Sequence, residues 1–157
     1  MVAILLTGMS GVGKSSVLAE LARRGFDTVD TDDGGWIRRD GGEPVWHESL
    51  MDGLLSRPRS GPLFVLGTVA NQGHFYDRFS AVVLLSAPRE VIAERLRTRT
   101  TNGFGKSEAE RAKIMRDIAD VEPLLRAGST HELDTRQPLD GTVAALLAIA
   151  AEGTERT

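Results

Sequence analysis

The chain of 157 residues is long enough for one domain with a hydrophobic core and too short for two domains of ordinary size. Hydrophobic residues make up 41% of it and charged residues 26%, as in soluble globular proteins, and the formal net charge of −3 argues against non-specific nucleic-acid binding. The lack of cysteine excludes disulfides and thiolate metal sites. No apolar run approaches the roughly 20 residues of a membrane span, and we recognise no targeting segment. We therefore expect a cytoplasmic protein.

The first predicted elements are a strand, a glycine-rich loop and a helix. The apolar run Val2–Leu6 is typical of a strand buried on both faces of a parallel sheet. The next segment, Gly8–Ser15, matches the P-loop pattern G-x-x-x-x-G-K-[ST] at every position. A helix follows, closed by Gly25, and its predicted buried stripe is Val17, Leu18 and Leu21.

This order predicts a site for ATP and Mg²⁺. Glycines allow positive φ, and the N–H groups at the start of a helix attract phosphate. Lys14 adds a positive charge for the β- and γ-phosphates, and the Ser15 hydroxyl is placed to ligate Mg²⁺. The residues expected to bind the nucleotide here are Gly11, Val12, Gly13, Lys14, Ser15 and Ser16.

Two aspartates follow the second predicted strand, residues 26–30. Asp30 and Asp32 are two positions apart, which on an extended chain directs both carboxylates to the same side. We expect Asp30 to help hold Mg²⁺ and Asp32 to accept the proton of an attacking hydroxyl. The alternative is that one of them only closes the turn at residues 31–35.

Residues 33–62 are expected to bind the phosphoryl acceptor. One helix is predicted near residues 46–56, with Trp46, Leu50, Leu54 and Leu55 facing inward. A third strand, residues 63–66, ends at Gly67, which is a candidate acceptor contact. The other candidate acceptor contacts are Trp36, Arg39, Asn71 and Gln72, although a turn explains the last two nearly as well.

A fourth strand is predicted at residues 81–85, followed by a helix from Pro88 to about Arg99. Arg95 and Arg99 share a face of that helix and either act on the transferred phosphoryl group or are simply solvated. Residues 99–107, with Lys106, are a candidate lid.

The remaining predictions complete one domain, residues 1–152. They are a helix from Ser107 that Pro123 should kink or interrupt, a weak strand at 131–133, a helix at 143–151 and a frayed tail at 153–157. Strands that alternate with helices predict an α/β fold, a doubly wound five-stranded parallel sheet with helices on both faces. Ligands bind such sheets beyond the carboxyl ends of the strands.

Taken together, these motifs resemble the small P-loop kinases related to shikimate kinase, gluconate kinase and adenylate kinase. The resemblance is carried by the P-loop, Asp30-x-Asp32, Arg95-x-x-x-Arg99, the turn at 85–88 and Asp134–Pro138. It implies an ATP-dependent phosphotransferase in which Asp30 helps hold magnesium and Asp32 contacts the acceptor hydroxyl. It also implies that Arg95 stacks on adenine, that Arg136 and Pro138 line the adenine, and that residues 99–107 close as a lid.

The chain departs from that family at the acceptor side. Gly67–Gln72 replaces a run of glycines found in shikimate kinases, and their acceptor-binding arginines have no clear counterpart between Gly41 and Pro62. We therefore expect a small-molecule acceptor with a hydroxyl or phosphate, no nucleic-acid or membrane partner, and a monomer or homodimer. The alternative is a nucleotide-dependent switch or a degenerate kinase that only binds ATP. The N-K-x-D element of switch GTPases is missing, and the third strand lacks the terminal Asp-Glu of AAA-type motors.

Overall fold

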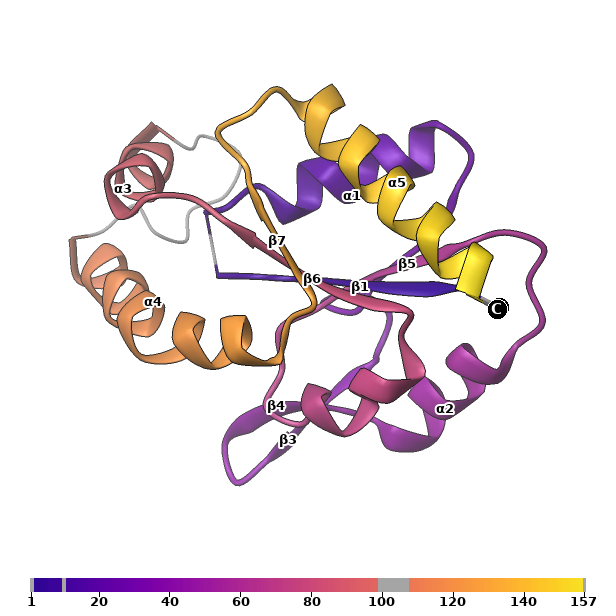
Figure 1. Ribbon diagram of the computed structural model, residues 1–157. Helices are drawn as coiled ribbons and strands as arrows, with labels where there is room; N and C mark the ends of the chain where they lie inside the picture. Colours follow the sequence, from indigo (N-terminus) through magenta and orange to yellow (C-terminus); the bar gives the residue numbers. More distant parts are fainter. Residues whose placement is uncertain (1, 10, 99–107, 157) are drawn as a thin grey trace.

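The computed structural model describes residues 2–9, 11–98 and 108–156 (Figure 1). Its central sheet is five-stranded and parallel, with strand order β2-β5-β1-β6-β7. The strands are β1 (Ala3–Thr7), β2 (Asp27–Asp30), β5 (Leu63–Leu66), β6 (Ala81–Ser86) and β7 (His131–Asp134). The predicted fold class is therefore confirmed.

Helices cover both faces of this sheet, which is why its central strands are continuous apolar runs. The helices are α1 (Lys14–Arg23), α2 (Glu48–Ser56), α3 (Arg89–Thr98), α4 (Glu108–Gly128) and α5 (Leu139–Arg156), with a 3₁₀ helix η1 at Gln72–Arg78. Figure 1 shows α1 and α5 along one face and α2 and α4 along the other. Alternate residues of β1 accordingly enter two cores, Ile4 beneath α1 and α5, and Leu5 beneath α2.

Residues 33–62, predicted to bind the acceptor, contain a β-hairpin that we did not predict. Strands β3 (Ile37–Asp40) and β4 (Glu43–Trp46) pair antiparallel across Gly41 and Gly42, whose φ angles are 59° and 85°. Positive φ at both central residues is what a tight two-residue hairpin turn requires, and glycine supplies it without strain.

The hairpin corrects the predicted helix at residues 46–56. Trp46 belongs to β4 and α2 begins only at Glu48, so the inward face of the helix is shifted. Met51 is buried, with Leu54 and Leu55, whereas Leu50, expected inside, is 47% exposed. Trp46 is nevertheless fully buried, as a strand residue.

The last two helices run further without a break than expected. Helix α4 continues through Pro123 without interruption, and α5 extends past the predicted tail boundary to Arg156. Gly153 is buried within α5, where an added Cβ would lie 3.0 Å from Ser80 Cβ, so the helix packs on the sheet where we expected fraying.

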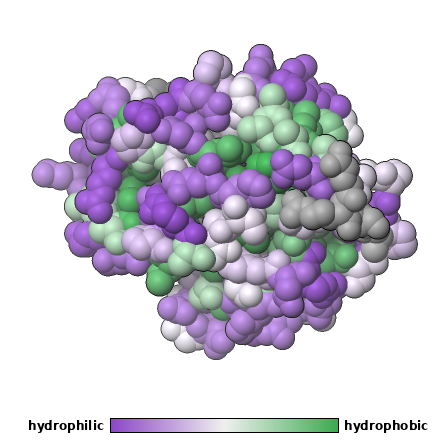
Figure 2. All heavy atoms as spheres, in the orientation of Figure 1, coloured by the Kyte–Doolittle hydropathy of each residue, from purple (hydrophilic) through white to green (hydrophobic). Residues whose placement is uncertain are grey.

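The surface is largely polar. Figure 2 shows hydrophilic residues over most of the viewed face, with hydrophobic ones between them. Among the described residues, no helix combines the length and apolar character of a membrane span.

Candidate active site

The P-loop leaves the carboxyl end of β1 and forms an uncapped helix start. Gly11 and Gly13 have the expected positive φ, 87° and 95°. Gly13 is the N-cap residue of α1, and no side chain forms a capping hydrogen bond there. The N–H groups of the first turn of α1 have no partners within the helix, so the loop is built to receive an anion.

Lys14 spans this loop. Its Nζ donates hydrogen bonds to the carbonyl oxygens of Gly8 (2.6 Å) and Met9 (3.2 Å). Gly8, Met9 and Lys14 line a cavity of about 240 Å³ together with Asp32 and Thr68. The structure therefore brings the predicted cation and the predicted base, 18 positions apart in the sequence, to one cavity.

The two aspartates differ in their surroundings. Oδ1 of Asp30 accepts a hydrogen bond from the Asp32 N–H at 3.0 Å, so Asp30 does close the turn, using one of its two carboxylate oxygens. The pKa of Asp32 is raised, first because its carboxylate is partly removed from water and then because Asp30 is negatively charged. Lys14 acts in the opposite direction and favours the ionised form.

A second cavity, of about 400 Å³, lies where the nucleotide base is expected. Val12, Gly13, Ser16 and Arg95, all predicted to bind the nucleotide, line this one cavity. Its remaining lining residues are Val17, Thr135, Gln137, Leu139 and Thr142.

In the segment after β7, the residues that line this cavity differ from the predicted Arg136 and Pro138. Arg136 is exposed and paired with Asp134 at 2.6 Å, and Pro138 accepts backbone hydrogen bonds from the first turn of α5. Neither lines the cavity, whereas Thr135, Gln137 and Leu139 do. The segment that the resemblance implied therefore borders this cavity, but through other side chains than the two predicted.

The predicted acceptor residues have mixed outcomes. The Asn71 amide exchanges two hydrogen bonds with the Trp46 backbone (2.9 and 3.1 Å). Gln72 is buried and bonds to Thr7 and Val69. Both amides thus hold the framework beneath the site, and we do not place them in contact with an acceptor.

The other acceptor candidates lie on or under the hairpin. Trp36 is half-buried against the core beneath α2, and Arg39 is exposed and bonds to the Gly42 carbonyl at 3.1 Å. Gly67 is buried, and an added Cβ would lie 2.5 Å from Thr31 Oγ1 and 2.8 Å from the Trp46 ring. Arg99 and the predicted lid, residues 99–107, lie outside the described residues.

Thr68 was missed by the sequence analysis. Its Oγ1 accepts a hydrogen bond from the Gly8 N–H at 3.2 Å and lies 2.8 Å from the Gly8 carbonyl oxygen, to which it can donate. A hydroxyl two positions after a buried strand was the available signal, because that is where the crevice of a parallel sheet lies.

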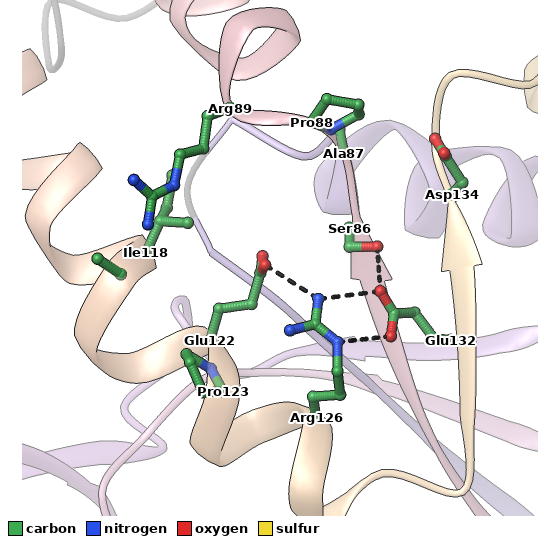
Figure 3. A pocket seen from close by; sticks show the side chains of 11 residues that line it. Ser86, Ala87, Pro88, Arg89, Ile118, Glu122, Pro123, Arg126, Glu132 and Asp134 are labelled. Carbon is green, nitrogen blue, oxygen red and sulfur yellow. Dashed lines mark hydrogen bonds and ion pairs between the residues drawn. The ribbon is translucent and has the colours of Figure 1, made fainter.

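A third cavity, of about 370 Å³, lies between α4 and β7 and is filled with paired charges (Figure 3). Arg126 donates to Glu132 at 2.8 Å and to Glu122 at 3.1 Å, and Ser86 donates to Glu132 at 2.7 Å. These bonds raise the pKa of Arg126 and lower that of Glu132. We assign this network to attachment of α4 to the sheet.

The oxygen groups at the P-loop suit a magnesium ion. Within the described ranges, no group of three or more histidine and acidic side chains could hold a metal by itself. Mg²⁺ in nucleotide sites keeps several waters and uses one or two protein ligands beside the phosphates. The two predicted ligands, the Ser15 hydroxyl and the Asp30 carboxylate, are oxygen donors of this kind and number, so their chemistry is compatible with Mg²⁺ beside ATP.

The chain resembles known proteins in sequence and in structure. Residues 4–116 match the model of a family described as an AAA domain. A shikimate kinase from Acinetobacter baumannii, solved in complex with shikimate, superposes with a TM-score of 0.67 at 21% identity, over 97% of this chain and 94% of that one. A gluconokinase from Sinorhizobium meliloti gives 0.60 at 22% identity, over 99% and 94%.

A sugar kinase from a Janibacter species gives a TM-score of 0.61 at 20% identity, over 94% of this chain and 93% of that one. No curated protein matches the sequence significantly.

Proposed function

Because this chain belongs to the AAA domain family and has the fold of small P-loop kinases, we propose that it transfers the γ-phosphoryl group of ATP to a hydroxyl or phosphate of a small molecule. The observation that carries the proposal is the shared cavity of Lys14 and Asp32 beside the P-loop. A nucleotide-binding protein needs the loop alone, whereas transfer to a hydroxyl also needs a group that receives the acceptor's proton.

The protein groups divide the reaction between them. Lys14 moves from the carbonyls of Gly8 and Met9 onto the β- and γ-phosphate oxygens, where its charge opposes the charge that builds up during transfer. When bound through Ser15 and Asp30, Mg²⁺ would neutralise part of the same charge. Asp32 orients the acceptor and takes its proton as the new oxygen–phosphorus bond forms and the bond to ADP breaks.

The raised pKa of Asp32 suits this role. A carboxylate with a higher pKa is a stronger base towards the proton of the acceptor. The Thr68 hydroxyl bonds to both the N–H and the carbonyl oxygen of Gly8, and it would keep the loop in place when Lys14 moves.

The test is a coupled measurement of ADP release across nucleosides, sugar acids, shikimate and aminocyclitols, with the product identified by ³¹P NMR. We expect acceptor-dependent ADP release that Lys14→Ala abolishes without unfolding the protein. Asp32→Asn should lower this release as well, and Asp33→Asn is its matched control, because Asp33 neighbours Asp32 but does not line the cavity. ATP binding without release, or release that no acceptor stimulates, would favour a binding module or switch instead.

A further inference from the structure

Arg95 is bonded to the backbone of the P-loop. Its NH1 group donates to the carbonyl oxygens of Gly11 (3.3 Å) and Val12 (3.2 Å), although helix α3 is more than 80 positions further along the chain. The resemblance implied that this guanidinium stacks on adenine. The hydrogen bonds indicate an additional task, because both acceptors belong to the loop that must receive phosphate.

The direction of these bonds fixes the peptide groups of the loop. The structure has no cis peptide bond in its described ranges, and in a trans peptide the C=O and N–H groups point in opposite directions. With the carbonyls of Gly11 and Val12 turned toward Arg95, the N–H groups of Val12 and Gly13 are turned away from it. Those are the donors that a P-loop directs at phosphate oxygens.

Thr135 holds the guanidinium in this position. Its Oγ1 accepts from Arg95 NH1 at 3.0 Å, and its carbonyl oxygen accepts from Arg95 NH2 at 3.0 Å. Thr135 is itself attached to the carboxyl end of β6, because its N–H and its Oγ1 donate to the Ser86 carbonyl at 2.8 and 3.2 Å. A continuous chain of hydrogen bonds thus runs from the sheet through Thr135 and Arg95 to the P-loop.

We propose that Thr135 is a positioning residue that acts through Arg95 to hold the P-loop N–H groups in their phosphate-binding orientation. This rests on the nucleotide-binding part of the proposed function and is independent of phosphoryl transfer. A preformed set of donors binds its anion more tightly, because the loop need not be ordered during binding.

The test uses inorganic tripolyphosphate, which has no base and so reports on the loop alone. Thr135→Val keeps the shape and the backbone bonds but loses the hydroxyl, and Thr135→Ser keeps the hydroxyl. We expect Thr135→Val to weaken tripolyphosphate binding, measured by calorimetry, by about tenfold, the scale of one hydrogen bond to a charged group. Thr135→Ser should stay within about twofold of the wild-type affinity.

Thr130→Val is the matched control. Thr130 precedes the first residue of β7, whereas Thr135 follows the last. The Thr130 hydroxyl bonds to the backbone of Val82 (2.9 and 3.1 Å), away from the P-loop. It should change melting temperature but not tripolyphosphate affinity. The proposal is overturned if Thr135→Val binds tripolyphosphate as the wild type does, including the case in which only adenosine binding or melting temperature changes.

Wild-type protein that binds no tripolyphosphate would overturn it as well. If no acceptor is ever phosphorylated but the Thr135→Val effect is measured, the kinase assignment fails and this inference stands.

Discussion

Gly67→Ala tests whether close packing at the end of β5 supports the acceptor side. The added Cβ would lie 2.5 Å from Thr31 Oγ1 and 2.8 Å from Trp46 Cζ2, so at least one of these buried groups must move. Thr31 Oγ1 donates to the Leu66 carbonyl at 2.8 Å and accepts from Trp46 Nε1 at 3.0 Å. Movement of either residue therefore strains or breaks a buried hydrogen bond.

The expected loss of stability is about 2 to 4 kcal/mol, from roughly 1 kcal/mol for a broken hydrogen bond and about 1 to 3 kcal/mol for overpacking. Backbone strain does not contribute, because Gly67 is not among the glycines with positive φ. The free energy of unfolding is measured by urea titration with tryptophan fluorescence, since Trp46 is fully buried in the native state.

Gly53→Ala is the matched control. Gly53 lies inside α2, with open space where the Cβ of an alanine would lie, so alanine should stabilise the protein by about 0.5 to 1 kcal/mol. The two substitutions add the same methyl group and are predicted to have opposite signs. If Gly67→Ala were as stable as the wild type, the packing between the hairpin and β5 would be looser than described, and the argument would be wrong.

Two further substitutions address the aspartates. Asp32→Asn should lower turnover by about 10²- to 10⁴-fold with little change in ATP affinity, measured by ADP release and tryptophan fluorescence. The melting temperature of Asp32→Asn at neutral pH should not fall, because the raised pKa of Asp32 means that its negative charge destabilises the folded protein. This destabilisation disappears as the pH falls through the pKa of the folded protein and the carboxylate is protonated. Full turnover with earlier melting would show that Asp32 only closes a turn. Asp30→Asn should raise the Mg²⁺ concentration for half-maximal rate, and an unchanged requirement would remove Asp30 from the metal site. In the metal-free protein the same variant should lower the pKa of Asp32, measured by NMR titration, because the Asp30 charge adds to burial in raising it; an unchanged pKa would mean that the two carboxylates do not interact.

The sheet could be predicted from sequence because burial on both faces gives its central strands continuous apolar runs. The hairpin could not be predicted in the same way. Strand β3 reads Ile-Arg-Arg-Asp and is mostly exposed, so it has no buried face to produce an alternating pattern. The remaining signal was Gly41-Gly42 between two short segments, which is typical of a two-residue turn. Because we did not use this signal, we assigned Trp46 to the helix at residues 46–56 and predicted an inward face for that helix that is shifted from the observed one.

The candidate site was predictable where a motif fixes the backbone and less so where tertiary contacts choose the partner. The P-loop pattern specifies a strand, a loop and a helix, and the structure has all three. Polar residues at strand ends can instead bond to ligand or to protein, and sequence does not distinguish the two. Gln72 bonds to the Thr7 side chain and Arg95 to the P-loop backbone, because distant elements of the chain offer these partners in the fold.

The strand order has a consequence for biosynthesis. Strand β1 is made before all the others, yet it lies at the centre of the sheet and pairs only with β5 and β6, which are about 60 and 80 positions away. Both edges of this apolar strand stay open until β5 has left the ribosome, and one edge stays open until β6 has followed it. Open apolar strands of this kind aggregate readily. The growing chain is therefore expected to need chaperone protection early. Thr68 can bond to Gly8 of the P-loop as soon as β5 has formed, whereas the bonds that link the loop through Arg95 to Thr135 need β7 as well.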